Sequence, residues 1–413
     1  MNLSKIFFLV VTFGLFVLVS SCKETPTKPE DELPEKEVIV PQINIPWSSL
    51  ADTPWPMYHH DPQSTGRSEY VGPQQGAISS VQFAEFGTMS GISIGYNKTA
   101  FLPSGDFSYR FVAFDYSGNV KWSNDFSSTS TPIISSDSSI YISTVNNTFL
   151  SLNRNGDTLW QTSIGKMYNI GCNIDKEGNI CFIDFHGSYI AELKVIDKNG
   201  KILWTLQDGR FLPSPDSQPS FSPDGNTLYV QGEKVSVLAI DINSKNVKWT
   251  FGDRELLSSP VIDNDGNIFI IIRTNSLGVT LYSINSDGEI NWQFDFFSRV
   301  LMDNVEPTID YNGNIYFGGD TLYSVTNNGK LRWAKSLDEG AIVAPIICDK
   351  NNDIYVATNR IQKIFSFTSD GKLKWKTAEL PFRTLGACPA ITDEGTLLFP
   401  SWRNYQISLS IIR

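Results

Sequence analysis

The densest group of potential metal ligands in the chain is the run His59-His60-Asp61, which contains two of its 3 histidines. Imidazole and carboxylate groups are common ligands of transition metals. Adjacent residues of an extended segment point in opposite directions, so the two imidazole rings do not converge on one ion. We therefore predict that these residues form no metal site.

Aspartate-rich turns offer a second possible chemistry, because residues 263–266 (DNDG) have the Asp-x-Asp-Gly spacing of a calcium loop. A complete loop needs about six or more oxygen ligands, including a later bidentate carboxylate. The sequence after Gly266 supplies only a short hairpin, so turn formation explains these residues better than calcium binding. No Walker loop occurs, and we predict no hydrolase triad. The prediction is a chain with no catalytic residue, no metal and no cofactor.

The five cysteines include one pair that a hairpin would bring together. Cys172 and Cys181 flank the turn sequence of residues 175–178 (DKEG), which predicts that they lie opposite each other on two strands. A disulfide between them is one possibility in an oxidising compartment. Buried, unpaired thiols are the alternative, because directly opposed residues on neighbouring strands fit disulfide geometry poorly.

The elements that carry these residues belong to a repeat that ends in tryptophan and recurs about every 42 residues, close to the roughly 40 to 45 residues of a propeller blade. Each copy places Asp, Asn or Thr, usually followed by Gly, between two alternating apolar stretches, which is the chemistry of a tight hairpin. The copies end at Trp122, Trp160, Trp204, Trp249, Trp292, Trp333 and Trp375.

A second hairpin pattern precedes each tryptophan copy, as in SPVIDNDGNIFI, so each period contains four strands. Apolar runs such as residues 268–272 predict strands that are covered on both faces. The last period lacks its tryptophan strand, and residues 79–86 form an orphan strand that supplies it, with Phe83 in the place of the tryptophan. We predict an all-β fold over residues 79–413: an eight-bladed β-propeller of four-stranded antiparallel blades, closed by an N-terminal strand that completes the last blade.

The N-terminal residues have the features of a lipoprotein signal peptide over residues 1–21. Lys5 precedes the apolar run of residues 6–19, which is too short for a membrane-spanning helix. Residues 19–22 (VSSC) resemble a lipobox, which implies that Cys22 is lipidated and becomes the mature N-terminus; an ordinary secretory signal with a chance cysteine is the alternative. Residues 22–56 are rich in Pro, Glu and Lys and predict a flexible tether. Residues 57–78 lead into the propeller.

The charge balance excludes one class of partner. The chain has 33 Lys and Arg against 44 Asp and Glu, with a formal net charge of -11. Such a protein repels phosphate backbones, and no stripe of basic residues interleaved with aromatics compensates for this. We predict no nucleic-acid partner.

Two segments resemble the pyrroloquinoline-quinone-like (PQQ-like) propellers. Residues 239–249 (AIDINSKNVKW) are similar to the docking motif of that family, with Ser244 for Thr and Lys245 for Gly. Residues 55–68 (WPMYHHDPQSTGRS) look like the lead-in that precedes such propellers. The resemblance implies that the tryptophans pack between neighbouring blades and that His59, His60 and Asp61 dock the lead-in onto the ring.

The family includes quinoprotein dehydrogenases, and these are typically longer and hold the quinone with a vicinal Cys-Cys disulfide and calcium. No such pair occurs here, so we predict a non-enzymatic protein-binding scaffold, lipid-anchored in the cell envelope, on the outer membrane or cell surface. Glycan or small-ligand binding at the propeller funnel is the alternative. In broad plan the chain is also similar to the propeller lipoprotein of the β-barrel assembly machine, and that role is a further alternative alongside a quinone enzyme.

Overall fold

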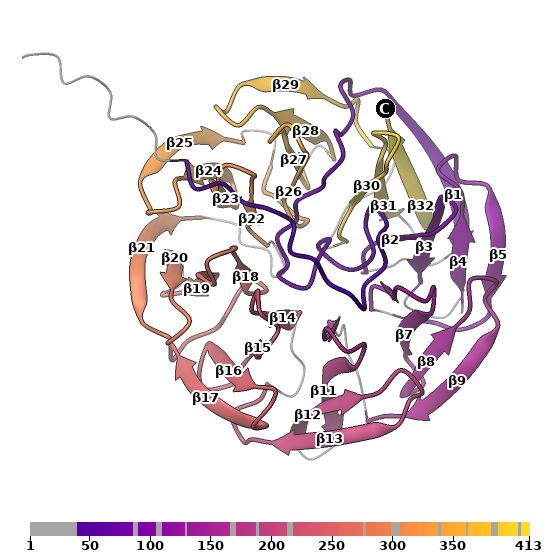
Figure 1. Ribbon diagram of the computed structural model, residues 1–413. Coiled ribbons are helices and arrows are strands. Elements are labelled where there is room, and N and C mark those ends of the chain that lie inside the picture. Colours follow the sequence, from indigo (N-terminus) through magenta and orange to yellow (C-terminus); the bar gives the residue numbers. More distant parts are fainter. Residues whose placement is uncertain are drawn as a thin grey trace, which may run out of the picture. The chain divides into compact units, whose positions relative to one another are not determined.

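The computed structural model of the chain describes most of residues 39–413. The described ranges are 39–85, 90–104, 110–128, 130–165, 171–186, 190–212, 218–275, 278–298, 306–337, 340–360, 362–380, 387–403 and 406–413. Within the compact unit Ile39–Arg413, these residues form eight four-stranded antiparallel sheets. The sheets follow one another around a central axis (Figure 1). The prediction of an all-β, eight-bladed propeller is confirmed.

In each blade the first strand lies nearest the axis and the last lies at the circumference (Figure 1), and we call these the inner and outer strands. Blades 1 to 4 are formed by β2 (Ser93–Gly95), β3 (Thr99–Pro103), β4 (Phe111–Phe114) and β5 (Val120–Asn124); β6 (Ile133–Ile134), β7 (Ile140–Thr144), β8 (Thr148–Leu152) and β9 (Thr158–Ser163); β10 (Cys172–Ile174), β11 (Ile180–His186), β12 (Ile190–Ile196) and β13 (Ile202–Gln207); and β14 (Ser220–Phe221), β15 (Thr227–Gln231), β16 (Val237–Asp241) and β17 (Asn246–Phe251).

The remaining blades repeat this order, except that the outer strand of blade 8 comes from the N-terminal side of the chain. Blades 5 to 8 are formed by β18 (Val261–Ile262), β19 (Ile268–Arg273), β20 (Gly278–Ile284) and β21 (Ile290–Phe297); β22 (Thr308–Ile309), β23 (Ile315–Gly318), β24 (Thr321–Val325) and β25 (Leu331–Ser336); β26 (Ile347–Cys348), β27 (Ile354–Ala357), β28 (Ile364–Phe367) and β29 (Leu373–Lys376); and β30 (Ala390–Ile391), β31 (Leu397–Arg403), β32 (Gln406–Ile412) and β1 (Ile78–Glu85).

The ring is closed by antiparallel pairing of β1 with β32, in which Ser80 lies opposite Ser410. This confirms the predicted closing strand, but the residue in the tryptophan position is different. At the neighbouring turn of blade 1, a β-carbon added to Gly118 would lie 2.7 Å from Val81. Tryptophans fill this place at other blades, so Val81 is the structural counterpart of the tryptophan. Phe83 packs instead against Phe114, with ring centroids 4.8 Å apart.

The DNDG sequence forms a turn, as predicted. The Asp263 carboxylate accepts hydrogen bonds from the backbone N–H groups of Asp265 (3.0 Å) and Asn267 (2.8 Å), and Gly266 has a φ of 83°, which favours glycine. Burial raises the pKa of Asp263 above its ordinary value. The backbone N–H groups of the same turn therefore occupy the carboxylate.

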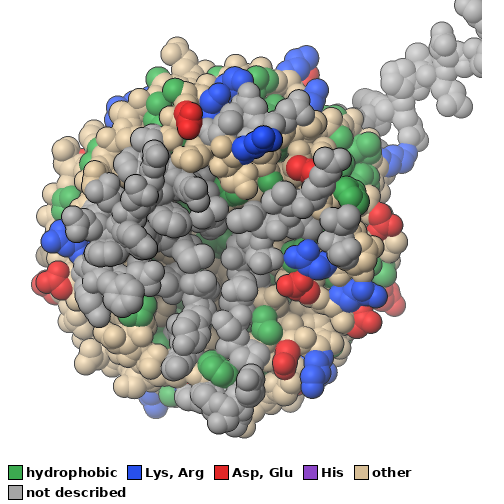
Figure 2. All heavy atoms as spheres, turned by 180° about the vertical axis from the view of Figure 1, so that it is seen from behind, with side chains coloured by type: hydrophobic (Ala, Val, Ile, Leu, Met, Phe, Trp, Pro, Cys, Tyr) green, Lys and Arg blue, Asp and Glu red, His purple; other side chains and the backbone are tan. Residues whose placement is uncertain are grey.

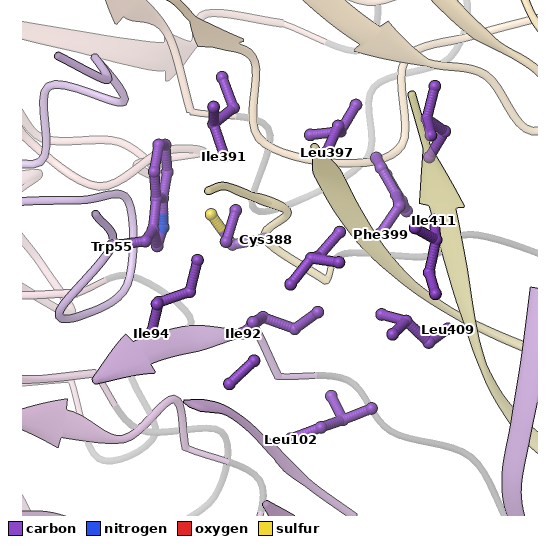
Figure 3. Close-up of a cluster of buried hydrophobic side chains, with 14 of the residues drawn as sticks. Trp55, Ile92, Ile94, Leu102, Cys388, Ile391, Leu397, Phe399, Leu409 and Ile411 are labelled. Carbon is purple, nitrogen blue, oxygen red and sulfur yellow. The ribbon is translucent and has the colours of Figure 1, made fainter. Parts of the chain in front are cut away.

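Apolar side chains pack between blades and form the core. One cluster joins blades 1, 7 and 8 and includes Trp55 of the N-terminal segment (Figure 3). The run of residues 268–272 is buried along its whole length, which confirms that this strand is covered on both faces. On the side seen in Figure 2, the described Lys, Arg, Asp and Glu side chains are interspersed around the circumference.

Candidate functional site

The N-terminal segment lies against the propeller from Ile39 onward. Its first arc runs from blade 6, where the Val40 N–H donates to the carbonyl of Asn312 (3.0 Å), to blade 1, where the Thr53 hydroxyl donates to the carbonyl of Ile94 (2.7 Å). Between them the buried indole of Trp47 donates to the carbonyl of Ile174 (2.8 Å). The predicted tether of residues 22–56 is therefore too long. Residues 39–56 belong to the propeller unit, because their apolar and hydrogen-bonding groups have partners there.

The centre of the ring is occupied by residues 55–66, which we call the hub (Figure 1). An inner strand has no neighbouring strand on its axial side, so its N–H groups need another partner. Backbone carbonyls of the hub accept hydrogen bonds from six inner strands. The pairs, hub carbonyl first, are Trp55–Ile94, Pro56–Ile134, Pro62–Phe221, Gln63–Ile262, Thr65–Ile309 and Gly66–Cys348, with lengths from 2.6 to 3.2 Å. The hub thus joins the blades at the axis.

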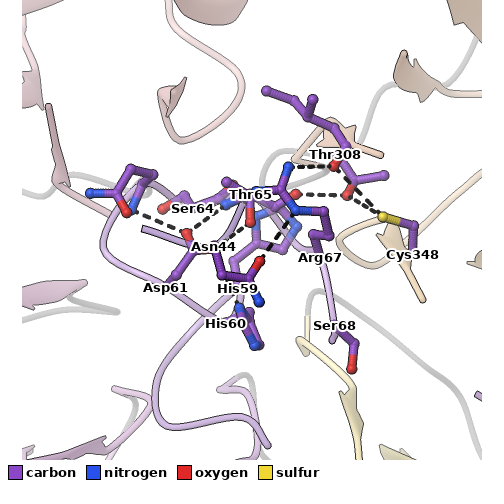
Figure 4. Close-up of polar contacts among 12 residues, drawn as sticks. Asn44, His59, His60, Asp61, Ser64, Thr65, Arg67, Ser68, Thr308 and Cys348 are labelled. Atoms are coloured by element: carbon purple, nitrogen blue, oxygen red, sulfur yellow. Dashed lines mark hydrogen bonds and ion pairs between the residues drawn. The ribbon is translucent and has the colours of Figure 1, made fainter. Parts of the chain in front are cut away.

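The two histidines of the hub contact different groups. The segment is a turn and not the predicted extended segment, because His59 and His60 have φ values of 52° and 79°. His59 is fully buried, with Nδ1 2.7 Å from the carbonyl of Ser64 and Nε2 3.0 Å from that of Ile346. His60 contacts the Asp61 carboxylate through Nδ1 (3.3 Å) and packs against the edge of Trp55. His59 therefore docks the lead-in onto the ring, whereas His60 packs within the N-terminal segment, and Figure 4 shows both residues.

Asp61 holds the hub turn in shape. Its carboxylate accepts hydrogen bonds from the N–H groups of Gln63 (3.1 Å) and Thr65 (3.0 Å) and from the Thr65 hydroxyl. Burial alone would raise the pKa of Asp61, but the hydrogen bonds from His60 and Thr65 and the charge of Arg67 outweigh it and hold the pKa below its ordinary value. The ionised form of this carboxyl therefore stabilises the folded protein.

We expect Asp61→Asn to lower the thermal midpoint at neutral pH and to lose this effect in acid. A depressed folded-state pKa contributes stability above the unfolded value of about 3.8, and this is lost as the pH falls through the folded pKa. Thermal melts of the wild type and the variant across this range measure the difference. A difference that is independent of pH would contradict the role assigned to the carboxylate.

Arg67 connects the two passes of the N-terminal segment. Its guanidinium is almost fully buried, donates to the carbonyl of Ile43 in the first arc (2.8 Å) and lies 4.8 Å from the ring centroid of Tyr311 in blade 6. The carbonyl of Ile309 in β22 accepts a further, longer hydrogen bond of 3.4 Å. A planar cation with several donors suits this position, where carbonyls and an aromatic face surround it.

The repeated tryptophans lie between neighbouring blades at the circumference. Six of the indole N–H groups donate to carbonyls of the next blade or of the lead-in. The pairs are Trp122–Arg154, Trp160–Lys198, Trp249–Ser286, Trp292–Asn327, Trp333–Ser369 and Trp375–Pro73, with lengths from 2.7 to 3.0 Å. Trp204 has a different neighbour. At the turn of the next blade Lys245 stands in place of the glycine, and the Lys245 ammonium lies 5.8 Å from the centroid of the Trp204 indole.

Comparisons with known proteins agree with this geometry. A family model described as outer membrane protein assembly factor BamB matches residues 191–296. Among solved structures, quinohemoprotein alcohol dehydrogenase from Comamonas testosteroni is similar, with a TM-score of 0.66 and 10% identity over 87% of this chain and 80% of that chain. The fold is that of a PQQ-like repeat β-propeller.

Two further structures share the propeller fold. A europium-containing methanol dehydrogenase has a TM-score of 0.65 and 9% identity over 87% of this chain and 98% of that chain. BamB from Moraxella catarrhalis has a TM-score of 0.57 and 13% identity over 81% of this chain and 97% of that chain. The comparison with curated proteins gives no match.

The residues of this PQQ-like propeller do not fit the quinone that the family name implies. No two cysteines are adjacent in the sequence, so the vicinal disulfide is impossible. Within the described ranges, no three His, Cys, Asp or Glu side chains are grouped so that they could hold a metal ion. The hub engages the axial edges of the inner strands with residues of the chain itself.

One serine motif of the propeller escaped the sequence analysis. Residues 91–95 (GISIG) have the Gly-x-Ser-x-Gly spacing of a hydrolase nucleophile elbow. An elbow exposes its serine on a strand-to-helix turn. Ser93 lies instead within the inner strand β2, is fully buried, and donates its hydroxyl to the carbonyl of Pro132. The motif therefore serves packing between blades 1 and 2.

The cysteine pair does not have the predicted arrangement. Cys172 lies opposite Phe182, and Cys181 lies opposite Asn173, so the register differs by one residue from direct opposition. Since successive side chains of a strand alternate between faces, the two thiols leave opposite faces of the sheet. Both are free and buried, as are Cys348 and Cys388. The predicted opposition is wrong, and the unpaired alternative describes the structure.

We expect the four propeller cysteines to resist alkylation in the native protein. Burial raises the pKa of Cys172 to about 12 and raises the pKa of the other three thiols as well, so very little thiolate forms at pH 8. Mass spectrometry after iodoacetamide treatment should find no adduct on them natively and four adducts in denaturant without reductant. Two missing adducts in denaturant would reveal a disulfide and contradict the free thiols.

A buried ionic cluster in blade 3 was also missed. Lys194 of β12 pairs with Asp184 of β11 and lies 3.2 Å from a carboxylate oxygen of Glu192, and all three side chains are less than one-tenth exposed. The same register positions in blade 2 hold Thr144, Thr148 and Leu150. The signal in the sequence was three charged residues within otherwise apolar strand patterns.

Cys22, the predicted lipid attachment residue, and the signal peptide of residues 1–21 lie outside the described residues. The search for membrane-spanning helices covered the described part of the chain and found none that is long and apolar enough.

Proposed function

We propose that the chain is a non-catalytic, membrane-anchored β-propeller that acts as a protein-binding scaffold in the cell envelope. The observation that carries this proposal is the hub. Residues 55–66 accept the axial hydrogen bonds of six blades. The axis of the propeller is therefore filled by a segment that joins the blades, and not by a substrate site. A rigid ring of eight blades with charged and polar turns offers surfaces for contacts with other proteins.

The match of residues 191–296 to the BamB family model supports an envelope role and favours a partner among proteins that assemble outer-membrane proteins. Fold similarity alone does not assign a function, because the same fold carries dehydrogenases. The misfit of the residues to a quinone supports the non-catalytic reading of this chain.

In-cell crosslinking followed by mass spectrometry tests the scaffold. We expect the chain to be recovered with one or a few envelope proteins. Recovery of envelope proteins without any component of the barrel assembly machine would remove that specific role, and recovery of no protein partner would contradict the scaffold itself. Binding to a glycan array with no crosslinked protein would favour the funnel alternative.

We expect Cys22→Ala to release the protein from the membrane fraction. The acyl chains on a lipidated cysteine contribute about 0.8 kcal/mol of membrane-binding free energy for each buried methylene, so their loss removes the anchor. Fractionation and palmitate labelling of the wild type and the variant measure the effect, and Cys388→Ala is the matched control that leaves the lipobox intact. Equal membrane retention of the wild type and Cys22→Ala would contradict the anchor.

A further inference from the structure

A groove of about 570 Å³ lies on the propeller face that carries the N-terminal segment. The first arc contributes lining residues from Asn44 to Thr53, and the hub contributes Pro56 and residues 60–62, together with Glu69. Tyr96 of blade 1 and Ser136 of blade 2 complete the lining. Its size falls within the roughly 300 to 1,000 Å³ of protein sites that receive a ligand group.

The charges of this groove all have one sign. Asp52 and Glu69 are exposed to solvent, Asp61 is the third acidic residue, and the lining contains neither lysine nor arginine. Tyr96 adds aromatic surface, whereas the ring of Trp47 is covered by Phe221 and by Lys176, whose ammonium lies 5.0 Å from the ring centroid. A concave surface with carboxylates and aromatic rings attracts cations through charge and through the ring faces.

His60 provides an independent indication of a ligand. The residue is 8% exposed and lines the groove, and its Nδ1 lies 3.3 Å from the Asp61 carboxylate. With the proton on Nδ1, the other ring nitrogen, Nε2, is a hydrogen-bond acceptor. No residue in the described ranges is bonded to Nε2. An acceptor that has no partner among the described residues and lies beside carboxylates matches a ligand that brings hydrogen-bond donors and positive charge.

We infer that the groove binds an arginine or lysine side chain from a basic segment of a protein partner. The inference rests on the proposed scaffold function and names the chemistry of the partner. Carboxylates of Asp52 and Glu69 approach the charge, and the Nε2 atom of His60 accepts one of its N–H groups. The ring of Tyr96 contacts the aliphatic stem.

Fluorescence anisotropy of the full chain with a labelled Gly-Arg repeat peptide tests the inference, with a Gly-Glu repeat peptide as the opposite charge. We expect the basic peptide to bind and the acidic peptide not to bind. Asp52→Asn combined with Glu69→Gln should weaken binding by about tenfold, since two partly screened ion pairs are lost. Glu233→Gln combined with Asp253→Asn removes the same charge from exposed positions outside the groove and should leave the affinity unchanged.

Equal affinity of the two double variants, or binding of the acidic peptide, would overturn the inference. Spermidine that binds as tightly as the basic peptide and displaces it would also overturn it, because the occupant would then be a small polycation. Peptide binding is measured without any cellular partner. If no peptide binds but envelope proteins are crosslinked, the groove inference is wrong and the scaffold proposal stands. If the basic peptide binds but no envelope protein is crosslinked, the scaffold proposal is wrong.

Discussion

Deletion of β1, residues 78–85, is expected to abolish cooperative unfolding of the propeller. β1 is the outer strand of blade 8 and pairs with β32 along seven residue positions. Without it, β32 becomes an open edge, and the apolar cluster that joins blades 1, 7 and 8 loses Ile78, Val81 and Phe83. Blade 8 then keeps its packing and the contacts with blade 1 made by the Ile92 N–H with the carbonyl of Cys388 and by Lys98 with Glu394, without a continuous sheet edge. Chemical denaturation followed by tryptophan fluorescence measures the result.

Two point variants keep this prediction testable if the deletion does not fold. Val81→Asp introduces a charge where Val81 packs against the turn of blade 1 at Gly118, and we expect it to lower the unfolding free energy by about 1 to 3 kcal/mol. Gln82→Asp adds the same charge at the adjacent exposed position of the strand and should have little effect. Similar midpoints for the two variants, or a β1 deletion that melts like the wild type, would refute the closure.

Lys194→Ala is expected to destabilise the protein by about 3 to 5 kcal/mol, which is the usual cost of leaving buried charges without their partner. Lys194 lies between Asp184 and Glu192 in blade 3, where all three side chains are nearly excluded from solvent. Its removal places two buried carboxylates side by side. A large fall in the denaturant midpoint, with little change in the slope of the transition, is the expected observation.

Blade 2 of the same chain supplies the matched control for the ionic cluster. Its register equivalents of Asp184, Glu192 and Lys194 are Thr144, Thr148 and Leu150, in that order. The triple variant Asp184→Thr, Glu192→Thr and Lys194→Leu removes the three charges together, and replacement of a buried ion cluster as a whole is often neutral or stabilising. We expect this variant to recover most of the loss. A triple variant that is as unstable as Lys194→Ala would show that the cluster contributes more than charge compensation.

The repeat architecture could be predicted because it depends on local chemistry. Turn sequences such as DNDG direct a hairpin through Asp263 and the positive φ of Gly266, and these interactions span only a few residues. The spacing of seven tryptophans then set the size of a blade. The orphan strand before the first blade was predictable for the same reason, since the last period lacked one strand. The residue of this strand that takes the tryptophan position could not be predicted. Val81 and Phe83 are both apolar, and only the packing against blade 1 decides which of them contacts the turn at Gly118.

Chain segments that lack a repeat could not be placed by the sequence. Pro-rich composition predicted a flexible tether, but residues 39–56 lie against the assembled ring, which provides the carbonyl and N–H groups that hold them. The sequence also did not predict the register of the strands that carry Cys172 and Cys181. The pairing around the turn sets this register, and a shift of one residue moves a thiol to the other face of the sheet. The groove beside His60 likewise joins residues that are distant in the chain, from Asn44 to Ser136.

The amino-acid sequence by itself determined the all-β class, the number of blades, the closing strand and the tryptophan repeat. Each of these features depends on turn residues and strand patterns whose interactions span only short stretches of chain. The tertiary structure decided where the N-terminal segment lies, which thiols are apart, and which charges meet in blade 3 and in the groove. These depend on surfaces that exist only after eight blades have closed into a ring.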